Sequence, residues 1–233
     1  MKVLGLSDTG YHRKKNEDRF IIKESGNAIL LAVMDGMGGL PGGERASELV
    51  QTFLAALELS PETKVGQLLE LIDKINDEIS RIEAEHPELY GMGSTLTAAV
   101  VHNNSVQYVH VGDSRLYLGH SGRLKQITKD HNMAQFLYEE GELTEEELLT
   151  SPMRNLLDQC LGGSFMAADS GVFAIEPGDR LLLCSDGIHD ELPPDEIASL
   201  MCGGSIEDLP KALIDAALAA GGRDNISAVV LEY

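Results

Sequence analysis

Basic residues are scarce in this chain. Its 233 residues contain 18 Lys and Arg against 38 Asp and Glu, which gives a formal net charge of −20 at pH 7. Surfaces that bind nucleic acid or anionic membranes are normally basic, so the composition argues against both partners. The hydrophobic content of 43% is too high for a disordered acidic tail. The acids therefore either form a solvated surface or include a cluster that holds cations.

Cysteines and long apolar runs are also few. Cys160, Cys184 and Cys202 show no CxxC spacing, which speaks against a disulfide framework or a zinc site and is typical of a reducing compartment. No run approaches the ~18 apolar residues of a membrane span. The apolar stretch at the N-terminus is too short for a secretory signal. We expect a cytoplasmic protein with no membrane association.

The strand pattern predicts a single domain with mostly antiparallel pairing. No linker or internal repeat divides the sequence, so we expect one domain over residues 1–233. Residues 101–106 and 120–123 have the composition of hairpin turns, which join antiparallel strands. The predicted strands are 19–23, 29–34, 95–102, 105–111, 115–119, 171–175, 180–185 and 226–233.

Helical periodicity marks two long segments. Residues 44–59 are rich in Ala and Leu, and residues 63–85 carry an apolar stripe opposite a charged face. We interpret the stripe as core packing rather than a cofactor or partner groove. A further helix is predicted over 206–220, and short helices over the acidic segment 139–147. Strands, then helices, then strands again indicate an α+β protein with helices packed on antiparallel sheets.

Acidic residues recur at the ends of predicted strands. Asp35, Asp113 and Asp186 each follow a buried-looking strand and adjoin a glycine, whereas Glu17-Asp18 and Asp224 come directly before strands. In an antiparallel sheet the end of one strand lies beside the start of its neighbour, so these carboxylates can converge at one edge. A single Asp-Gly pair is usually an ordinary turn. A set of five such acidic sites is better explained by a shared role.

Bound cations would explain such a cluster. Carboxylates brought together without cations repel one another, and Mg²⁺ or Mn²⁺ with all-oxygen ligands removes the repulsion. Asp190, four residues after Asp186, is either a further ligand or a surface acid. The sequence has no HExxH pair, Walker A loop, GxGxxG fingerprint, EF-hand loop or GxSxG elbow to suggest another chemistry.

A series of short motifs matches one family in order, from Ser7 to the C-terminus. They are Ser7-Asp8-Thr9-Gly10, Arg13-x-x-Asn16-Glu17-Asp18, Asp35-Gly36-Met37-Gly38-Gly39, Gly43-Glu44-Arg45-Ala46-Ser47, Gly93-Ser94-Thr95, Val111-Gly112-Asp113-Ser114-Arg115, Thr128-Lys129-Asp130-His131, Leu161-Gly162-Gly163, Ser185-Asp186-Gly187-Ile188-His189-Asp190 and Gly222-Arg223-Asp224-Asn225-Ile226-Ser227. With these motifs the chain resembles the PP2C-type (PPM) metal-dependent serine/threonine protein phosphatases in their compact bacterial form. The resemblance implies a four-layer α-β-β-α sandwich, two antiparallel sheets flanked by helices.

The resemblance also implies roles for particular residues. Asp35 would bridge two Mn²⁺ or Mg²⁺ ions, with Asp186 and Asp224 on the first ion. The second ion would be held by Glu17, Asp18 and the backbone carbonyl of Gly36. A third, weaker site would involve Asp113 with Asp186 or Asp190. Arg13 would grip the substrate phosphate, for which a bidentate guanidinium is well suited.

The implied reaction is hydrolysis of phosphoserine and phosphothreonine in proteins by a hydroxide that bridges the two metals. A Ser/Thr kinase is the expected functional partner, and a monomer is expected. Some relatives carry a histidine two residues after the bridging aspartate, where this chain has Met37. Two alternatives stay open. One is a narrow phosphatase for a phosphorylated anti-anti-sigma or stressosome protein, which the presence of Arg13 disfavours. The other is a non-catalytic metal-binding module.

Three further features are assigned from the sequence. We expect His131 to be structural and His189 to face solvent. Residues 131–161 correspond to the family's flap, which is Glu-rich here; its glutamates form either a solvated helix face or a surface that favours phosphosites with basic flanks. In residues 158–160 the chain has Asp-Gln-Cys where relatives often have Thr-Arg-Ala, so a substrate contact is expected to be missing there.

Overall fold

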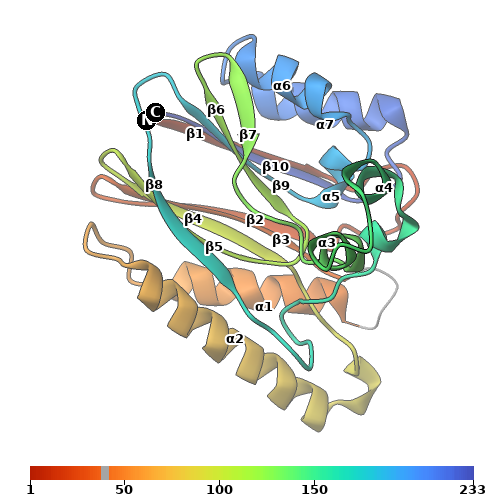
Figure 1. The fold of residues 1–233 in the computed structure, drawn as a ribbon. Helices are drawn as coiled ribbons and strands as arrows, with labels where there is room; N and C mark the ends of the chain where they lie inside the picture. Colours follow the sequence, from red (N-terminus) through yellow and green to blue (C-terminus); the bar gives the residue numbers. More distant parts are fainter. Residues whose placement is uncertain (38–41) are drawn as a thin grey trace.

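Two five-stranded sheets form the centre of the molecule (Figure 1), which a computed structural model describes for residues 1–37 and 42–233. One sheet has the order β1 (Lys2–Asp8), β10 (Ile226–Glu232), β9 (Arg180–Cys184), β6 (Arg115–His120) and β7 (Arg123–Gln126). The other has the order β2 (Asp18–Ser25), β3 (Ala28–Asp35), β4 (Leu96–His102), β5 (Ser105–Val111) and β8 (Asp169–Ala174). Neighbouring strands are antiparallel throughout, as the hairpin pattern predicted.

Helices cover the outer faces of both sheets, so the predicted four-layer α-β-β-α sandwich is confirmed (Figure 1). Helices α1 (Gly43–Ala56) and α2 (Val65–Glu85) lie over the β2–β8 sheet, and α6 (Pro194–Cys202) and α7 (Leu209–Ala220) lie over the β1–β7 sheet. Helices α3 (Met133–Glu139), α4 (Glu145–Thr150) and α5 (Asp186–His189) gather at one end. Short 3₁₀ turns η1 (Pro87–Leu89) and η2 (Pro152–Asn155) complete the elements.

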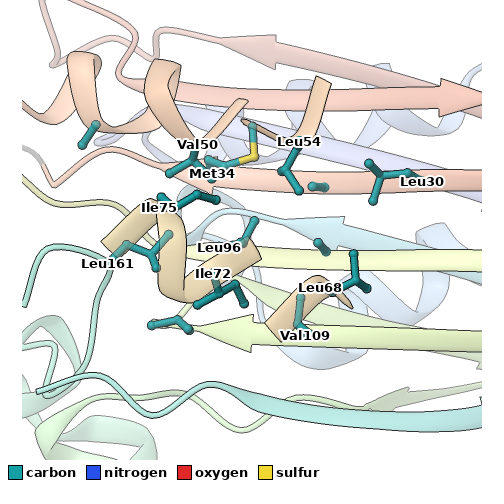
Figure 2. Close-up of a cluster of buried hydrophobic side chains, with 14 of the residues drawn as sticks. Leu30, Met34, Val50, Leu54, Leu68, Ile72, Ile75, Leu96, Val109 and Leu161 are labelled. Carbon is teal, nitrogen blue, oxygen red and sulfur yellow. The ribbon is translucent and has the colours of Figure 1, made fainter. Parts of the chain in front are cut away.

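The alternating side chains of β3 explain why this strand is buried on both faces. Leu30 and Met34 point toward α1 and α2, where they pack with Val50, Leu54 and Ile75 (Figure 2). Their neighbours in the strand, Ile29, Leu31 and Val33, point into the layer between the two sheets. Successive strand residues face opposite sides, so a continuous apolar run suits a strand covered on both sides.

The apolar stripe of α2 packs into the core, as predicted. Leu68, Ile72, Ile75, Ile79 and Ile82 are all buried, and they face the β2–β8 sheet (Figure 2). Cys184 is buried at the end of β9, also as predicted, whereas Cys202 is exposed. None of the helices in the described residues is both long and apolar enough to cross a membrane.

Some elements were not predicted. Strand β1 lies at the edge of its sheet, so it is only partly buried and its apolar residues alternate weakly. Strand β7, the partner of β6 in a hairpin, has only four residues and lies at the opposite edge. Helix α6 was missed although Pro193 precedes it and Pro194 is its first residue, a position where proline is tolerated. The short helices expected over 139–147 cover only its two ends, since α3 ends at Glu139 and α4 begins at Glu145. Asn132 and Thr144 cap the N-termini of these two helices.

Candidate metal centre at one end of the sandwich

Strand register brings the first two acids together. Asp18 begins β2 and lies directly opposite Asp35, which ends β3. The side chain of Thr95 accepts a hydrogen bond from the Asp35 amide at 3.0 Å, and the Thr95 amide donates to the Asp35 carbonyl at 2.8 Å. Both the amide and the carbonyl of Asp35 are therefore fixed by Thr95.

The other sheet supplies Asp186 and Asp224 to the same end. Asp186 follows β9, Asp224 precedes β10, and these strands are paired neighbours. The Ser185 hydroxyl donates to Asp18 Oδ2 at 2.7 Å and so links the ends of the two sheets. Acids from strand ends of both sheets thus meet at one end of the sandwich.

A cleft of about 540 Å³ opens at this end. Its walls include most of the residues singled out from the sequence: Arg13, Glu17, Asp35, Gly36, Met37, Asp113, Asp186, Asp190 and Asp224. Asp18 is not in the wall; it lies beneath it with 2% of its surface exposed. Gly38 and Gly39, which belong to the motif after Asp35, lie outside the described residues.

Burial and mutual repulsion shape the charges of the cluster. Burial, joined by repulsion from Asp18, Asp186 and other acids, raises the pKa of Asp35 well above its usual value. The pKa of Asp186 is raised in the same way, first by burial and then by Asp113 and Asp224. Burial raises the pKa of Asp18 to about 6 and that of Asp113 to about 7. Each of these four carboxylic acids is therefore harder to ionise than an exposed one.

Divalent cations fit this donor set. Asp18 Oδ1 and Asp186 Oδ1 are buried and have no hydrogen-bond partner among the described residues. A buried carboxylate oxygen without a partner is costly, and hard cations such as Mg²⁺ and Mn²⁺ prefer carboxylate ligands. However, no three His, Cys, Asp or Glu side chains within residues 1–37 and 42–233 are gathered into a closed ligand group. The carboxylates face one cleft without forming a complete coordination shell.

Arginines engage some of these carboxylates instead. Arg13 donates to Asp224 Oδ2 at 2.6 Å, and Arg154 donates to Asp190 Oδ1 at 2.8 Å. Burial alone would raise the pKa of Asp190, but the neighbouring His189 and Arg154 lower it. Two of the acids predicted from the sequence are thus turned toward guanidinium groups.

Three residues that sequence reasoning did not select hold the site in place. Asn225 Oδ1 accepts from the Glu17 amide at 2.8 Å, and its Nδ2 donates to the carbonyls of Thr9 and Lys15 at 2.8 and 2.9 Å. Asn225 therefore fixes the loop that carries Arg13. The sequence could have indicated Asn225 because it adjoins Asp224, and Ser185 because it adjoins Asp186. Arg154 had no such signal, because its contact with Asp190 spans 36 residues.

Gly36 is required by close backbone packing. A Cβ at this position would lie 2.3 Å from the Gly43 carbonyl oxygen and 2.8 Å from the Glu17 carbonyl oxygen. The Gly36 amide also donates to the Glu17 carbonyl at 3.2 Å. Only glycine allows the chain after Asp35 to approach the Glu17 loop this closely.

The structure confirms the prediction for one of the two histidines considered, His131, and contradicts the prediction for the other, His189. His131 is structural, as predicted: it is buried, and its Nδ1 accepts from the Gly112 amide at 3.3 Å. The prediction that His189 faces solvent is wrong. His189 is buried, and its Nε2 lies 3.0 Å from the Asp113 carbonyl oxygen, because the short helix α5 turns it inward against the loop after β5.

The fold and the cleft together define a class: a two-sheet sandwich with an acidic, cation-compatible site at one end. A family model described as protein phosphatase 2C matches residues 11–216. The serine/threonine protein phosphatase PstP of Mycobacterium tuberculosis is 39% identical over 100% of this chain. The chain spans only 45% of that relative's length. A putative protein phosphatase 2C-type from Streptococcus pyogenes is 35% identical over 97% of this chain and 95% of its own length.

Solved structures agree with this similarity. The catalytic domain of PstP in complex with two manganese ions superimposes with a TM-score of 0.87 at 36% identity, covering 99% of this chain and 97% of that one. The chain belongs to the protein phosphatase 2C family.

Proposed function

We propose that this chain hydrolyses phosphoserine and phosphothreonine in proteins, using Mn²⁺ or Mg²⁺. The observation that carries the proposal is the register that sets Asp18 opposite Asp35, with Asp186 and Asp224 brought to the same end by the other sheet. The relative solved with two manganese ions has the same fold, which supports two cations for this chain as well.

The ligands follow the sequence assignment. Asp35 would be shared by both ions, with Asp186 and Asp224 for one ion and Glu17, Asp18 and the Gly36 carbonyl for the other. Asp113 and Asp190 are the candidates for a third. When bound, such ions supply Lewis acidity, which lowers the pKa of water and neutralises charge on the phosphoryl oxygens.

Arg13 is the proposed phosphate-binding residue. Its guanidinium lines the cleft and now donates to Asp224, from which it can turn to two oxygens of a phosphate dianion. Met37 lines the cleft at the position where some relatives have a histidine, and none of the described residues that line the cleft is a histidine. The protein side chains therefore bind and orient the phosphate without a histidine proton donor.

A broad serine/threonine phosphatase is favoured over the two alternatives. Arg13 at the cleft supports general recognition of phosphate rather than the narrow regulatory function. The buried carboxylate oxygens without partners favour bound cations, which the non-catalytic module shares, whereas Arg13 beside them adds a phosphate contact that favours catalysis.

The proposed setting follows from the same features. We propose a single catalytic domain over residues 1–233, with a flap at 131–161, acting as a monomer in the cytoplasm and opposing a Ser/Thr kinase. Phosphoproteins are the proposed partners, with neither nucleic acid nor membrane among them. The net charge of −20 and the three free cysteines support these assignments.

One assay tests the proposed activity. Hydrolysis of p-nitrophenyl phosphate and of a phosphothreonine peptide is measured with Mn²⁺ and with EDTA. We expect turnover of both substrates with Mn²⁺ and none with EDTA. A protein that binds Mn²⁺ but does not turn over either substrate would support the non-catalytic alternative.

A further inference from the structure

A hollow of about 300 Å³ separates the flap from the body of the molecule. One side is formed by Leu148 and Leu149 of α4, and the opposite side by Pro194 and Ala198 of α6. Arg115, from β6, lies in the wall as well. The hollow thus lies between the flap and α6, and its walls combine these apolar side chains with polar and charged ones such as Arg115, Asp130 and Arg154.

Arg154 connects this hollow with the metal-site cleft. Its side chain lines both spaces. One amino group donates to Asp190 at 2.8 Å in the cleft, and the other donates to the Leu149 carbonyl at 3.2 Å beside the hollow. A polypeptide whose phosphate sits in the cleft can thus reach the hollow by passing a single side chain.

The two positive charges of the hollow are already compensated. Arg115 is bound through two hydrogen bonds to Asp130, at 2.8 and 2.6 Å, and Arg154 is paired with Asp190. Asp195, in the first turn of α6, also lines the hollow and is exposed. It forms no side-chain hydrogen bond or ion pair with any residue that the structure describes. The hollow thus keeps one negative charge without a partner, in a chain of net charge −20.

We propose that this hollow is a substrate subsite for an Arg or Lys side chain of the phosphoprotein. The aliphatic stem would pack between Leu148, Leu149 and Pro194, and the cationic head would meet Asp195. Long basic side chains commonly bury their stems on apolar surface while their charge stays near water. Because an extended chain advances ~3.3 Å per residue, the basic residue lies a few residues from the phosphorylated one. The subsite rests on the proposed phosphatase activity and specifies its substrate class.

The test is a peptide scan with two matched variants. Phosphothreonine peptides carry a single Arg at each of several positions before and after the phosphoresidue, in an alanine background, and kcat/KM is measured with Mn²⁺. Asp195→Lys reverses the charge in the hollow. Glu196→Lys makes the same change in net charge at the next residue, which is exposed and does not line the hollow. Ala198→Leu reduces the space without changing charge.

We expect Arg at one or two positions to raise kcat/KM about fivefold over alanine, the size of an exposed ion pair. Asp195→Lys should abolish that gain, Ala198→Leu should reduce it, and Glu196→Lys should keep it. A flat scan, a preference for acidic residues, or equal losses in both Lys variants would overturn the subsite. Turnover of p-nitrophenyl phosphate by the wild type separates these outcomes from failure of the proposed activity: without it, the activity itself is wrong.

Discussion

Asp18 and Asp35 face each other across β2 and β3, although neighbouring carboxylates repel one another; Asp18 is buried, and Asp35 is half-buried in the cleft wall. The arrangement raises both pKa values, first through burial. Such a cluster weakens the protein without cations and provides ligands for them. Substitutions that remove a carboxylate from this site are therefore expected to lower activity but to raise stability in the absence of cations.

Replacing Asp35 should show this trade-off. We expect Asp35→Asn to lower kcat/KM by about a hundredfold or more, because the central ligand loses its charge. In EDTA its melting temperature should equal or exceed that of the wild type, because a buried repulsion is removed. Steady-state kinetics and thermal unfolding check the two parts. Activity at the wild-type level would rule out Asp35 as a ligand, and a strong loss of stability would point to a structural role.

Arg13 should act mainly on substrate binding. Arg13→Ala removes a charge-assisted contact to phosphate, so we expect KM for a phosphopeptide to rise about tenfold or more while kcat changes less. Arg223→Ala is the matched control: this arginine also lines the cleft, but it is bound to Glu191 at 2.8 Å. Equal effects of the two variants would mean that general positive charge, rather than Arg13, holds the phosphate.

Among the elements, α2 contributes mainly to the core. Ile75 is fully buried against the β2–β8 sheet (Figure 2). We expect Ile75→Ala to lower the free energy of unfolding by about 2–5 kcal/mol, because it removes apolar contacts and leaves a cavity. Asp73→Ala, on the exposed face of the same helix, should change it by less than about 0.5 kcal/mol. Denaturant unfolding measures both; similar values would contradict the packing of this stripe.

The flap is attached to the Asp186–His189 helix region by the Arg154–Asp190 ion pair, beside the hollow. Arg154→Ala removes this attachment. We expect a protease specific for glutamate to cut the flap, for example at Glu145 and Glu146, several times faster in this variant. Arg223→Ala, which breaks a pair outside the flap, should leave the cleavage rate unchanged. No difference between the variants would show that other contacts hold the flap.

For the whole molecule, a buried histidine makes stability depend on pH. Burial, together with the neighbouring His131 ring, lowers the pKa of His110 from 6.5 to about 4. Between these values the unfolded chain binds a proton that the folded protein does not, so folding stability falls as the pH drops from 6.5 to 4 and is unaffected by this group above 6.5. The loss amounts to about 3 kcal/mol at most.

The variant His110→Gln isolates this contribution. It is expected to show a flatter stability profile between pH 6.5 and 4 than the wild type, whatever its absolute stability. Denaturant unfolding at several pH values in EDTA provides the measurement. Parallel profiles for the two proteins would mean that the pKa of His110 is the same in the folded and unfolded states.

Local sequence pattern determined most of the elements and the identity of the acids. Burial could be predicted for two segments, the continuous apolar run 29–34 and the apolar stripe from Leu68 to Ile82. In both, the spacing of apolar residues follows from the geometry of the strand or helix backbone. The close approach of the Gly43 carbonyl gives the physical reason for the glycine that adjoins Asp35 in the sequence. Edge strand β1 and helix α6 were missed, because partial burial leaves a weak pattern.

Only the tertiary structure decided which groups contact the acids. Arg154 reaches Asp190 over 36 residues, Ser185 reaches Asp18 over 167, and His189 turns inward to the Asp113 carbonyl. These contacts depend on how the two sheets stack and where the flap lies, which no local spacing encodes. The scarcity of basic residues predicted, from composition alone, that neither nucleic acid nor an anionic membrane is a partner. Where the few arginines are placed, at the cleft and beside the hollow, follows from the fold.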